Sequence, residues 1–295
     1  MIKVNDTIIE NKQFPDGTQC LFNINTEAFV NMNNVTISWY YENDSEMATL
    51  LFLKKHIEEN NDFAKNNIVL KMLYIPNARM DRVKSKNEVF TLKYFCDFIN
   101  YLNFRKVYVL DPHSDVSVAL INNIEIVKPD TFIFKALYEI EDLGISSDYK
   151  NSTYIYFPDA GSMKRYKDMF PDNNIIYGEK DREWSTGKII GLKIFNQHGE
   201  RLEATEENKP LKHKNILMVD DIISYGGTFA YSADKLKSLG ASSIFAYASH
   251  VENSIINDDR NLVRDRLNKG IIDKLYTTDS LYNGGTTDKI KVVNC

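Results

Sequence analysis

NILMVDDIISYGGTF, residues 215–229, predicts the local structure around which the second half of the chain folds. Its residues 216–219 are a short apolar run of the kind that forms a buried strand, and residues 230–239 beyond it suit a helix. Asp220, Asp221 and a glycine loop lie between the two. We therefore expect a strand, an acidic turn, a glycine loop and a helix, in that order.

The residue types in this stretch suit a ribose phosphate. Two adjacent carboxylates at the end of a strand can hold ribose hydroxyls or a bound magnesium ion. Gly226, Gly227 and Thr228 lead into the helix, where free backbone N–H groups favour a phosphate. The alternative is that Asp220 and Asp221 only end a strand and that the glycines form an ordinary tight turn.

Length, composition and charge exclude several classes of protein. A chain of 295 residues has room for about two domains, and 43% hydrophobic with 26% charged residues is typical of a soluble globular protein. No apolar run approaches membrane-spanning length and the start, MIKVNDTIIENKQ, is too polar for a secretion signal, so we expect a cytoplasmic protein without a membrane partner. A formal net charge of −5 argues against a nucleic-acid partner. Three cysteines, far apart and odd in number, indicate neither a disulfide framework nor a zinc site.

Strand-like and helix-like segments alternate along the chain, which predicts a parallel α/β sheet. In such sheets ligands gather beyond the carboxyl ends of the strands, so polar clusters that follow strands are candidate site residues. Strand-like runs occupy residues 35–40, 68–75, 106–110, 153–157, 175–177 and 243–248. Helix-like runs occupy residues 45–58, 91–102 and 162–169. One arm of a hairpin is expected at residues 188–195, and a strand–turn–strand segment at residues 274–293.

Two polar clusters follow strands of the first half. Arg79 and Asp81 come after one strand, and Arg79 could clamp a polyphosphate through its planar fork of donors. The alternative is a solvated loop with a few surface ion pairs. His113 lies between Asp111 and Asp115 in the next cluster, which hints at a metal site but also suits a loop histidine with ordinary partners.

Seven motifs occur in one order along nearly the whole chain: FPDG, NARMDR, LDPHSD, FPDAG with Lys164 and Arg165, the K-x-R of Lys180 and Arg182, VDDIISYGGT and KLYTTDSL. In this order they resemble the ribose-phosphate diphosphokinases, also called phosphoribosyl-pyrophosphate synthetases. The resemblance implies two phosphoribosyltransferase-like α/β domains with mainly parallel sheets flanked by helices. Residues 1–135 would form the domain on the ATP side, and residues 136–295 the domain with the ribose-phosphate loop and a catalytic flap. The resemblance also implies an active site between the domains and a homo-oligomer in which a neighbouring subunit completes the adenine pocket.

Carried over position by position, the resemblance assigns the candidate site residues. The catalytic pair on the flap would be Lys180 and Arg182, and magnesium would be held by His113 and Asp159. ATP would be the co-substrate, bound by Phe14, Asp16, Arg79, Asp81 and His113, with Phe14 and Asp16 serving a neighbour's site. The ribose and its 5-phosphate would bind Asp220, Asp221, Ser224, Tyr225, Gly226, Gly227 and Thr228.

The implied reaction is attack of an anomeric ribose hydroxyl on the β-phosphorus of ATP, which transfers a diphosphate and expels AMP. Arginine, lysine and magnesium suit this reaction because they neutralise charge on phosphoryl oxygens. A flap bearing Lys180 and Arg182 would add its charges on closing, although KDREW read alone would be an exposed charged turn. Around Gly187 and Lys188 the chain lacks both the upstream glycine and the Ser or Thr of a Walker A loop, so a P-loop kinase is not expected.

Departures from the family pattern lie near the substrates. Thr18 stands where a glutamate is expected and Met80 where a glutamine is expected, both near the nucleotide. The phosphate loop usually reads D-T-x-G-T, but here Ser224 replaces the acid and Tyr225 replaces a small hydroxyl. Tyr225 either packs against its own domain or offers a stacking face to an acceptor whose 5-phosphate carries a further group. ADP-ribose is such an acceptor, because its terminal ribose has a free anomeric hydroxyl, and its use would point to NAD metabolism.

A diphosphokinase that acts on ribose 5-phosphate or on a substituted form such as ADP-ribose is the favoured function. One alternative is a phosphoribosyltransferase that consumes phosphoribosyl pyrophosphate, against which the motifs NARMDR and LDPHSD argue. The other is a catalytically silent regulatory relative, against which the retained Lys180, Arg182 and His113 argue. Release of AMP from ATP would distinguish the first hypothesis from both alternatives.

Overall fold

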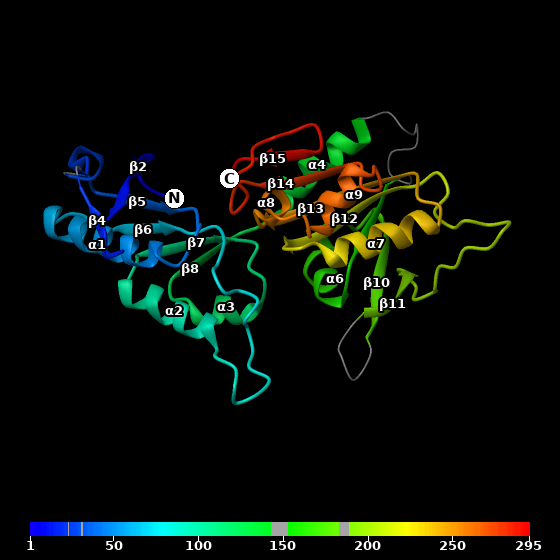
Figure 1. The fold of residues 1–295 in the computed structure, drawn as a ribbon, viewed down its shortest axis with the longest axis horizontal. Coiled ribbons are helices and arrows are strands. Elements are labelled where there is room, and N and C mark those ends of the chain that lie inside the picture. The colour runs from blue at the N-terminus through cyan, green and yellow to red at the C-terminus, as the bar shows by residue number, and fades with distance from the viewer. Residues whose placement is uncertain (23, 31, 143–152, 183–188) are drawn as a thin grey trace. The chain divides into compact units, whose positions relative to one another are not determined.

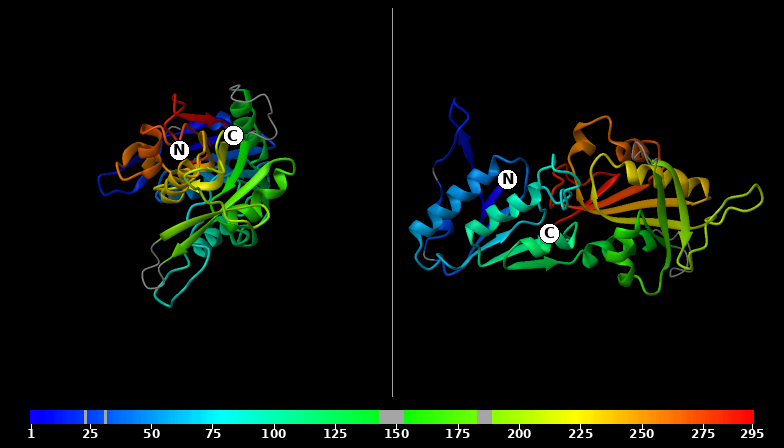
Figure 2. Two further views of the ribbon diagram at one scale, coloured as in Figure 1. Left: turned by 90° about the vertical axis from the view of Figure 1, so that its right-hand side faces the viewer. Right: turned by 90° about the horizontal axis from the view of Figure 1, so that it is seen from below.

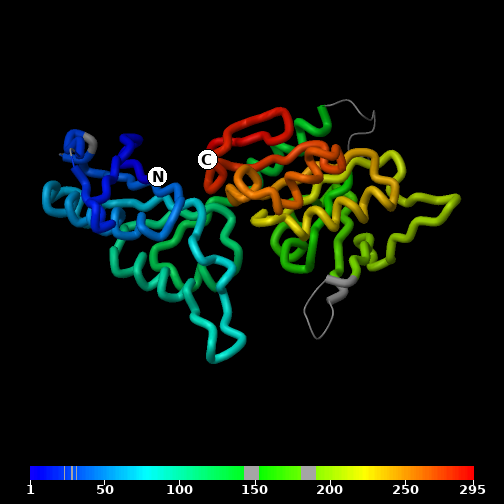
Figure 3. Tube along the Cα trace, viewed as in Figure 1, coloured from blue at the N-terminus to red at the C-terminus, as the bar shows by residue number. Residues whose placement is uncertain are grey.

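The chain divides into two compact units, Met1–Lys128 and Pro129–Cys295, in a computed structural model. The structure describes residues 1–22, 24–30, 32–142, 153–182 and 189–295, and Figures 1 and 3 draw the remainder in grey. Helix α4 (Asp130–Asp142) contacts strands of the second unit, so the division falls before α4 rather than at the predicted residue 135 within it. None of the helices in these ranges is both long and apolar enough to cross a membrane.

The first unit is built on a six-stranded sheet in the order β2-β1-β5-β6-β7-β8. Strands β5 to β8 run parallel, whereas β1 pairs antiparallel with β2 and β5, and β3 and β4 form a separate hairpin. Its elements are β1 (Ile2–Val4), β2 (Thr7–Ile9), β3 (Asn11–Gln13), β4 (Gln19–Leu21), η1 (Thr26–Ala28), β5 (Val35–Trp39), α1 (Glu46–Asn60), β6 (Ile68–Lys71), α2 (Thr91–Leu102), β7 (Lys106–Leu110), α3 (Asp115–Leu120) and β8 (Ile124–Val127).

The second unit contains a seven-stranded sheet in the order β11-β10-β9-β12-β13-β14-β15. Among the described strand pairs of this sheet, β10–β11 is antiparallel and the others are parallel. After α4 come β9 (Thr153–Phe157), α6 (Ala160–Tyr166), η2 (Lys167–Met169), β10 (Asn174–Arg182), β11 (Ile189–Asn196), β12 (Asn215–Ile223), α7 (Gly227–Ser238), β13 (Ser243–Val251), α8 (Ser254–Asn257), α9 (Leu262–Asn268), β14 (Lys274–Thr278) and β15 (Ile290–Val293).

Helices cover both faces of the second sheet because successive strand side chains alternate between the faces. In β12, Ile216 and Met218 pack with α7 and α9, whereas Leu217 and Val219 pack with α4 and α6. Figure 2 shows the strands between these two layers of helices. The central strand is therefore apolar on both sides until it reaches Asp220, which is why it reads as an unbroken apolar run.

The predicted class, an α/β protein with mainly parallel sheets flanked by helices, is confirmed. One local prediction was wrong: the strand does not end before Asp220 but continues to Ile223, since β13 pairs with it up to that residue. The following helix also starts earlier than predicted, at Gly227 rather than Ala230. The acidic pair thus lies within β12, and the glycine loop leads into α7 without a further turn.

Candidate active site

The candidate site forms where β9 ends beside β12, which continues further. The two strands pair in parallel as far as Tyr156 and Met218, and β12 then runs on with only β13 as its partner. The chain leaves β9 through Asp159 into α6, which contacts β12 (Figure 1). The start of α6 and the aspartates of β12 are therefore brought together at the edge where the sheet narrows.

Arg165 of α6 contacts both aspartates of β12. Its Nη2 donates to Asp221 Oδ1 at 2.5 Å and to Asp220 Oδ1 at 3.2 Å, and the Asp221 side chain is almost fully buried at 2% exposure. Burial and the neighbouring charge of Asp221 raise the pKa of Asp220 well above its usual range. The guanidinium offsets part of the repulsion between the two carboxylates, so the pair can lie close together.

Asp159 has two local partners with different roles. It is the N-cap of α6, where its Oδ1 accepts from the N–H groups of Gly161 and Ser162 in a capping box. Its Oδ2 lies 3.3 Å from Lys180 Nζ. Burial works in the opposite direction, but the Ser162 N–H and the Lys180 charge prevail and lower the pKa of Asp159. Asp159 is thus an ionised carboxylate with one oxygen fixed and one facing a cation.

Lys180 links that carboxylate to the loop before α7. Its side chain, only 12% exposed, projects from β10 and its Nζ also donates to Thr228 Oγ1 at 3.1 Å. Thr228 lies in the first turn of α7, whose leading N–H groups have no acceptor within the helix and favour an anion. A lysine charge and a helix start therefore meet at one place, which suits a phosphate. Arg182 also belongs to β10, but its side chain lies outside the described residues.

The glycine loop has a conformation that its sequence requires. Gly226 adopts a φ of +74°, a left-handed value that costs other residues free energy. A Cβ at this position would lie 2.4 Å from Val263 Cγ2 of α9, so the loop and that helix touch. Ser224, which replaces the expected acid, donates its hydroxyl to Glu252 Oε2 at 2.6 Å. A carboxylate is therefore present beside the loop, although a different element supplies it.

Tyr225 does not pack into the interior of its own unit. Its side chain is 47% exposed, and the Arg260 guanidinium carbon lies 5.2 Å from the centre of the ring. Of the two sequence interpretations, an exposed aromatic at the loop agrees with this geometry. The sequence pattern gave no role to Arg260, which lies 35 residues further along the chain.

The predicted ATP residues lie in the first unit. Arg79 is exposed in the turn that follows β6, and the partly buried Asp81 lies 3.9 Å from Arg82 Nε. His113 is partly buried just before α3. The role of each of these residues in ATP binding stays a prediction.

Phe14 and Asp16 lie at the tip of the β3–β4 hairpin. Phe14 is 49% exposed and meets Phe22 edge to face at a centroid distance of 6.1 Å. Asp16 accepts hydrogen bonds from the N–H and hydroxyl of Thr18, and the hydroxyl contact is the main reason that the pKa of Asp16 is lowered. The tip is thus well ordered by local bonds while it presents an aromatic ring to the outside.

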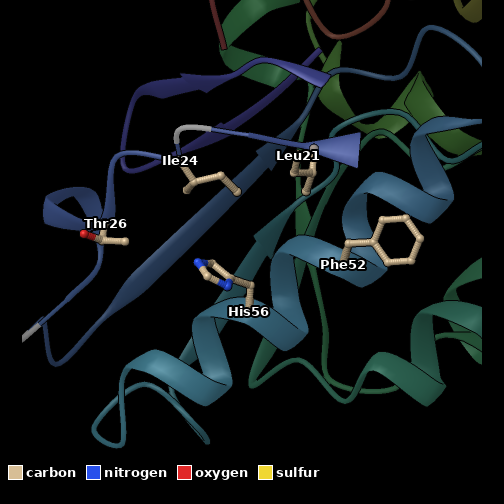
Figure 4. A pocket seen from close by; sticks show the side chains of 5 residues that line it. All are labelled: Leu21, Ile24, Thr26, Phe52 and His56. Atoms are coloured by element: carbon tan, nitrogen blue, oxygen red, sulfur yellow. The ribbon is translucent and has the colours of Figure 1, made fainter. Parts of the chain in front are cut away.

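A pocket of about 530 Å³ in the first unit contains none of the predicted ATP residues. Figure 4 shows that His56 and Phe52 line it from α1, and that Leu21, Ile24 and Thr26 come from β4 and the segment after it. Its lining is mainly apolar and includes no Lys, Arg, Asp or Glu side chain. The pocket therefore adds nothing to the binding of a polyphosphate.

Magnesium fits the donor set at Asp159. Mg²⁺ bound with substrate phosphates commonly uses only one or two protein carboxylates and otherwise water. Asp159 Oδ2 is the oxygen not used in helix capping, and the lowered pKa of this carboxyl keeps it anionic. Within the described ranges no three His, Cys, Asp or Glu side chains form a cluster that could hold a metal by themselves.

Three further residues belong to this site, although the sequence pattern assigned none of them a role. Arg165 was quoted with the FPDAG motif, and its two partners in β12 lie 55 and 56 residues further along the chain. Glu252 and Arg260 lie 28 and 35 residues from their partners Ser224 and Tyr225. Only the parallel strand order could have indicated Glu252, because it directly follows β13, the neighbour of β12.

The fold and this edge of the sheet define a two-unit α/β protein with a glycine loop between a central strand and a helix. The structure of a phosphoribosylpyrophosphate synthetase from Mycobacterium smegmatis matches 97% of this chain and 86% of its own length, with a TM-score of 0.69 and 15% identity. No family model matches the chain. Curated relatives also match by sequence, and two of them show the extent of the match.

Both relatives carry the same name. The ribose-phosphate pyrophosphokinase of Pyrococcus abyssi is 28% identical over 82% of this chain and 75% of its own length. That of Pyrococcus furiosus is 27% identical over 93% of this chain and 86% of its own length. The chain is a homologue of the ribose-phosphate pyrophosphokinases, and the resemblance seen in its seven motifs is confirmed.

Proposed function

We propose that the chain is a diphosphokinase that transfers the β,γ-diphosphate of Mg-ATP to the anomeric hydroxyl of a ribose 5-phosphate unit. The anomeric oxygen forms a bond to the β-phosphorus, and the bond from that phosphorus to the α,β-bridging oxygen breaks. AMP leaves with the bridging oxygen, and the hydroxyl proton is released. The names of the relatives support this reaction, since a ribose-phosphate pyrophosphokinase is by its name an enzyme that transfers a diphosphate to a ribose phosphate.

The position of Lys180 is the observation that carries the proposal. Its Nζ lies within 3.3 Å of Asp159 and within 3.1 Å of Thr228, between a carboxylate suited to magnesium and a helix start suited to a phosphate. A cation held there by two partners needs little reorganisation when charge grows on transferred phosphoryl oxygens. Lys180 and Arg182 are proposed as the catalytic pair.

Binding of the acceptor is assigned to the neighbouring residues. Asp220 and Asp221 would accept hydrogen bonds from the ribose hydroxyls, in place of those that they accept from Arg165. The N–H groups at the start of α7 would bind the 5-phosphate. Asp159 of the second unit and His113 of the first unit are each proposed as a magnesium ligand, and Mg²⁺ would neutralise charge on the diphosphate. Arg79 and Asp81 are proposed to contact ATP.

The acceptor is either ribose 5-phosphate or a form such as ADP-ribose, whose 5-phosphate is bridged to a second phosphate. Glu252 lies 2.6 Å from Ser224 at the loop, so a terminal phosphate with two negative charges would come close to a carboxylate. A bridged phosphate carries less charge. The exposed ring of Tyr225 supports the same choice. Action on ADP-ribose would place the protein in NAD metabolism.

A homo-oligomer is the proposed assembly. The exposed Phe14 and the bonded turn at Asp16 present the β3–β4 hairpin tip to the outside, as a part that enters a neighbour's adenine site would require. A phosphoribosyltransferase or a silent regulatory relative remains the alternative function. Neither of them would release AMP from ATP.

The test is AMP release from Mg-ATP with ribose 5-phosphate and ADP-ribose offered in separate reactions. The wild-type chain should release AMP with at least one acceptor, and Lys180→Ala should lower the rate on the order of 100-fold or more. Lys167→Ala, which removes an exposed lysine just after α6, is the matched control and should keep the wild-type rate. The absence of acceptor-dependent AMP would refute the diphosphokinase and favour the alternatives.

A further inference from the structure

The segment from α8 to the start of α9 holds the backbone of the phosphate loop. Ser254 Oγ and Asn261 Nδ2 donate to the Ser224 carbonyl oxygen at 3.0 and 2.9 Å. The N–H of Leu262 donates to the Tyr225 carbonyl oxygen at 2.9 Å. Two successive carbonyls of the loop are thus fixed, and the position from which the Tyr225 side chain projects is fixed with them.

Arg260 of the same segment lies over the ring that the loop presents. Its Nη2 donates to the Tyr225 hydroxyl at 3.1 Å, and its guanidinium carbon lies 5.2 Å from the ring centre. Asp258 orients the guanidinium, accepting from Nε at 2.9 Å and from Nη2 at 2.6 Å. The guanidinium is therefore held by a carboxylate, a hydroxyl and an aromatic ring together.

This arrangement lies largely in solvent. The Arg260 side chain is 77% exposed, and exposed ion pairs contribute little to the stability of a fold. Among the described residues, no acceptor forms a hydrogen bond with its Nη1 group. The Arg260 guanidinium is therefore oriented through one edge, and its Nη1 edge is available to a ligand. A planar guanidinium held in this way is suited to binding a phosphate.

We propose that Arg260, oriented by Asp258 and Tyr225, forms an acceptor subsite for the group beyond the 5-phosphate. The ligand is a ribose 5-phosphate joined by a phosphoanhydride bridge to a second phosphate, and the ribose on that second phosphate carries an aromatic base. Arg260 Nη1 donates to the second phosphate, and the open part of the Tyr225 ring contacts the base. This inference rests on the proposed function of the loop as the 5-phosphate site and names the acceptor class for it.

The test is equilibrium binding by isothermal titration calorimetry without ATP, so that it does not depend on catalysis. The probes are ADP-ribose and ribose 5-phosphate. Wild-type protein should bind ADP-ribose more tightly than ribose 5-phosphate. Arg260→Ala should lower the ratio of the two affinities at least 10-fold, and Arg260→Lys should lower it less, since a lysine keeps the charge but loses the fork.

Arg264→Ala is the matched control, because Arg264 comes from the same segment but pairs with Asp259 and the Ile256 carbonyl rather than with Tyr225. It should leave the ratio within about 2-fold, the spread left by a general change of surface charge. Tyr225→Phe keeps the ring and loses the hydroxyl contact. If Arg260 only pinned Tyr225 in place, Tyr225→Phe would reproduce the full effect of Arg260→Ala and the inference would fail.

Two other results would also overturn the inference: equal losses of both affinities in Arg260→Ala, or no preference of the wild-type protein for ADP-ribose. Failure of the proposed function would look different. AMP release would then be missing with both acceptors, whatever the affinities are. The two experiments therefore separate an error about the subsite from an error about the reaction.

Discussion

At the scale of single residues, the site is dominated by charges that are buried or half-buried in pairs. Asp220 and Asp221 both pair with the guanidinium of Arg165, and Asp159 pairs with the ammonium of Lys180, which also donates to Thr228. Such pairs keep a site ordered before substrate arrives, but they also make the fold depend on pH. Asp220 shows this dependence most directly.

Replacing Asp220 by asparagine should stabilise the protein at neutral pH. Burial and the Asp221 charge raise the pKa of Asp220 in the folded state, so the folded state favours the protonated form. The stability contributed by this group is present below its unfolded pKa, about 4, and is lost as pH rises through the folded pKa. Asp220→Asn should therefore have a higher Tm than wild type at pH 7, and the difference should shrink toward pH 4.

Differential scanning fluorimetry between pH 4 and pH 8 measures this effect. Asp172→Asn, at an exposed aspartate of the same unit, is the control and should show no such trend. The same Asp220→Asn protein should release less AMP, because it lacks a carboxylate for the ribose hydroxyls. An equal or lower Tm of Asp220→Asn at pH 7 would show that Arg165 compensates the buried charge fully.

At the scale of elements, α6 depends on the same aspartate that serves the site. Asp159→Asn should keep the N-cap, since asparagine caps helices about as well as aspartate, whereas Asp159→Ala should cost about 1 kcal/mol in the free energy of unfolding. Both variants remove the charge that faces Lys180 and that is proposed to hold magnesium, so both should lose AMP release on the order of 100-fold.

Urea unfolding and the AMP assay together distinguish the two roles of this residue. The expected result is two variants that differ in stability and agree in activity. An active Asp159→Asn would mean that capping, and not the negative charge, is what the site needs from this position. Equal stability of the two variants would instead mean that the capping box contributes nothing measurable.

The elements themselves were largely predictable from local pattern. The predicted bounds of α2 and β7 agree with the structure, because one has an amphipathic repeat and the other a short apolar run between polar turns. β12 was predicted too short, because its last four residues are held by pairing with β13 and two of them are acidic. Local composition does not contain that pairing.

The candidate site was only partly predictable for a related reason. Candidate residues of the loop itself, such as Gly226 and Thr228, can be assigned from the order of motifs. Residues that act across the fold cannot. Arg165 is separated by more than fifty residues in sequence from its partners in β12, and Arg260 is 35 residues from Tyr225. Nothing in the local sequence distinguishes these arginines from ordinary surface charges.

At the scale of the whole molecule, the proposed oligomer can be tested by complementation between inactive variants. Lys180→Ala removes the proposed catalytic lysine, and a Phe14→Ala, Asp16→Ala double variant removes the side chains of the hairpin tip. If the tip of one subunit completes the site of another, each variant alone should be inactive. Unfolded together and refolded as a mixture, they should regain about a quarter of wild-type AMP release, the fraction of intact sites under random pairing.

If the mixture recovers no AMP release although circular dichroism shows that each variant is folded, the hairpin serves its own chain. Light scattering on the wild-type protein provides the independent check, since a monomer would exclude shared sites outright. An active hairpin variant would show that the tip is not needed for ATP.

The glycine at position 226 also bears on how the lineage of this protein can be interpreted. An alanine there meets three separate obstacles: the φ of +74°, the Val263 side chain at 2.4 Å and the Val263 backbone nitrogen at 3.1 Å. Shrinking residue 263 removes only one of them, so no single compensating change opens the position. A descendant that had lost its substrate would still inherit this glycine. A glycine kept at this position in a distant sequence would therefore indicate only that the loop still packs against the helix. Retained chemistry is better judged from residues that packing does not constrain.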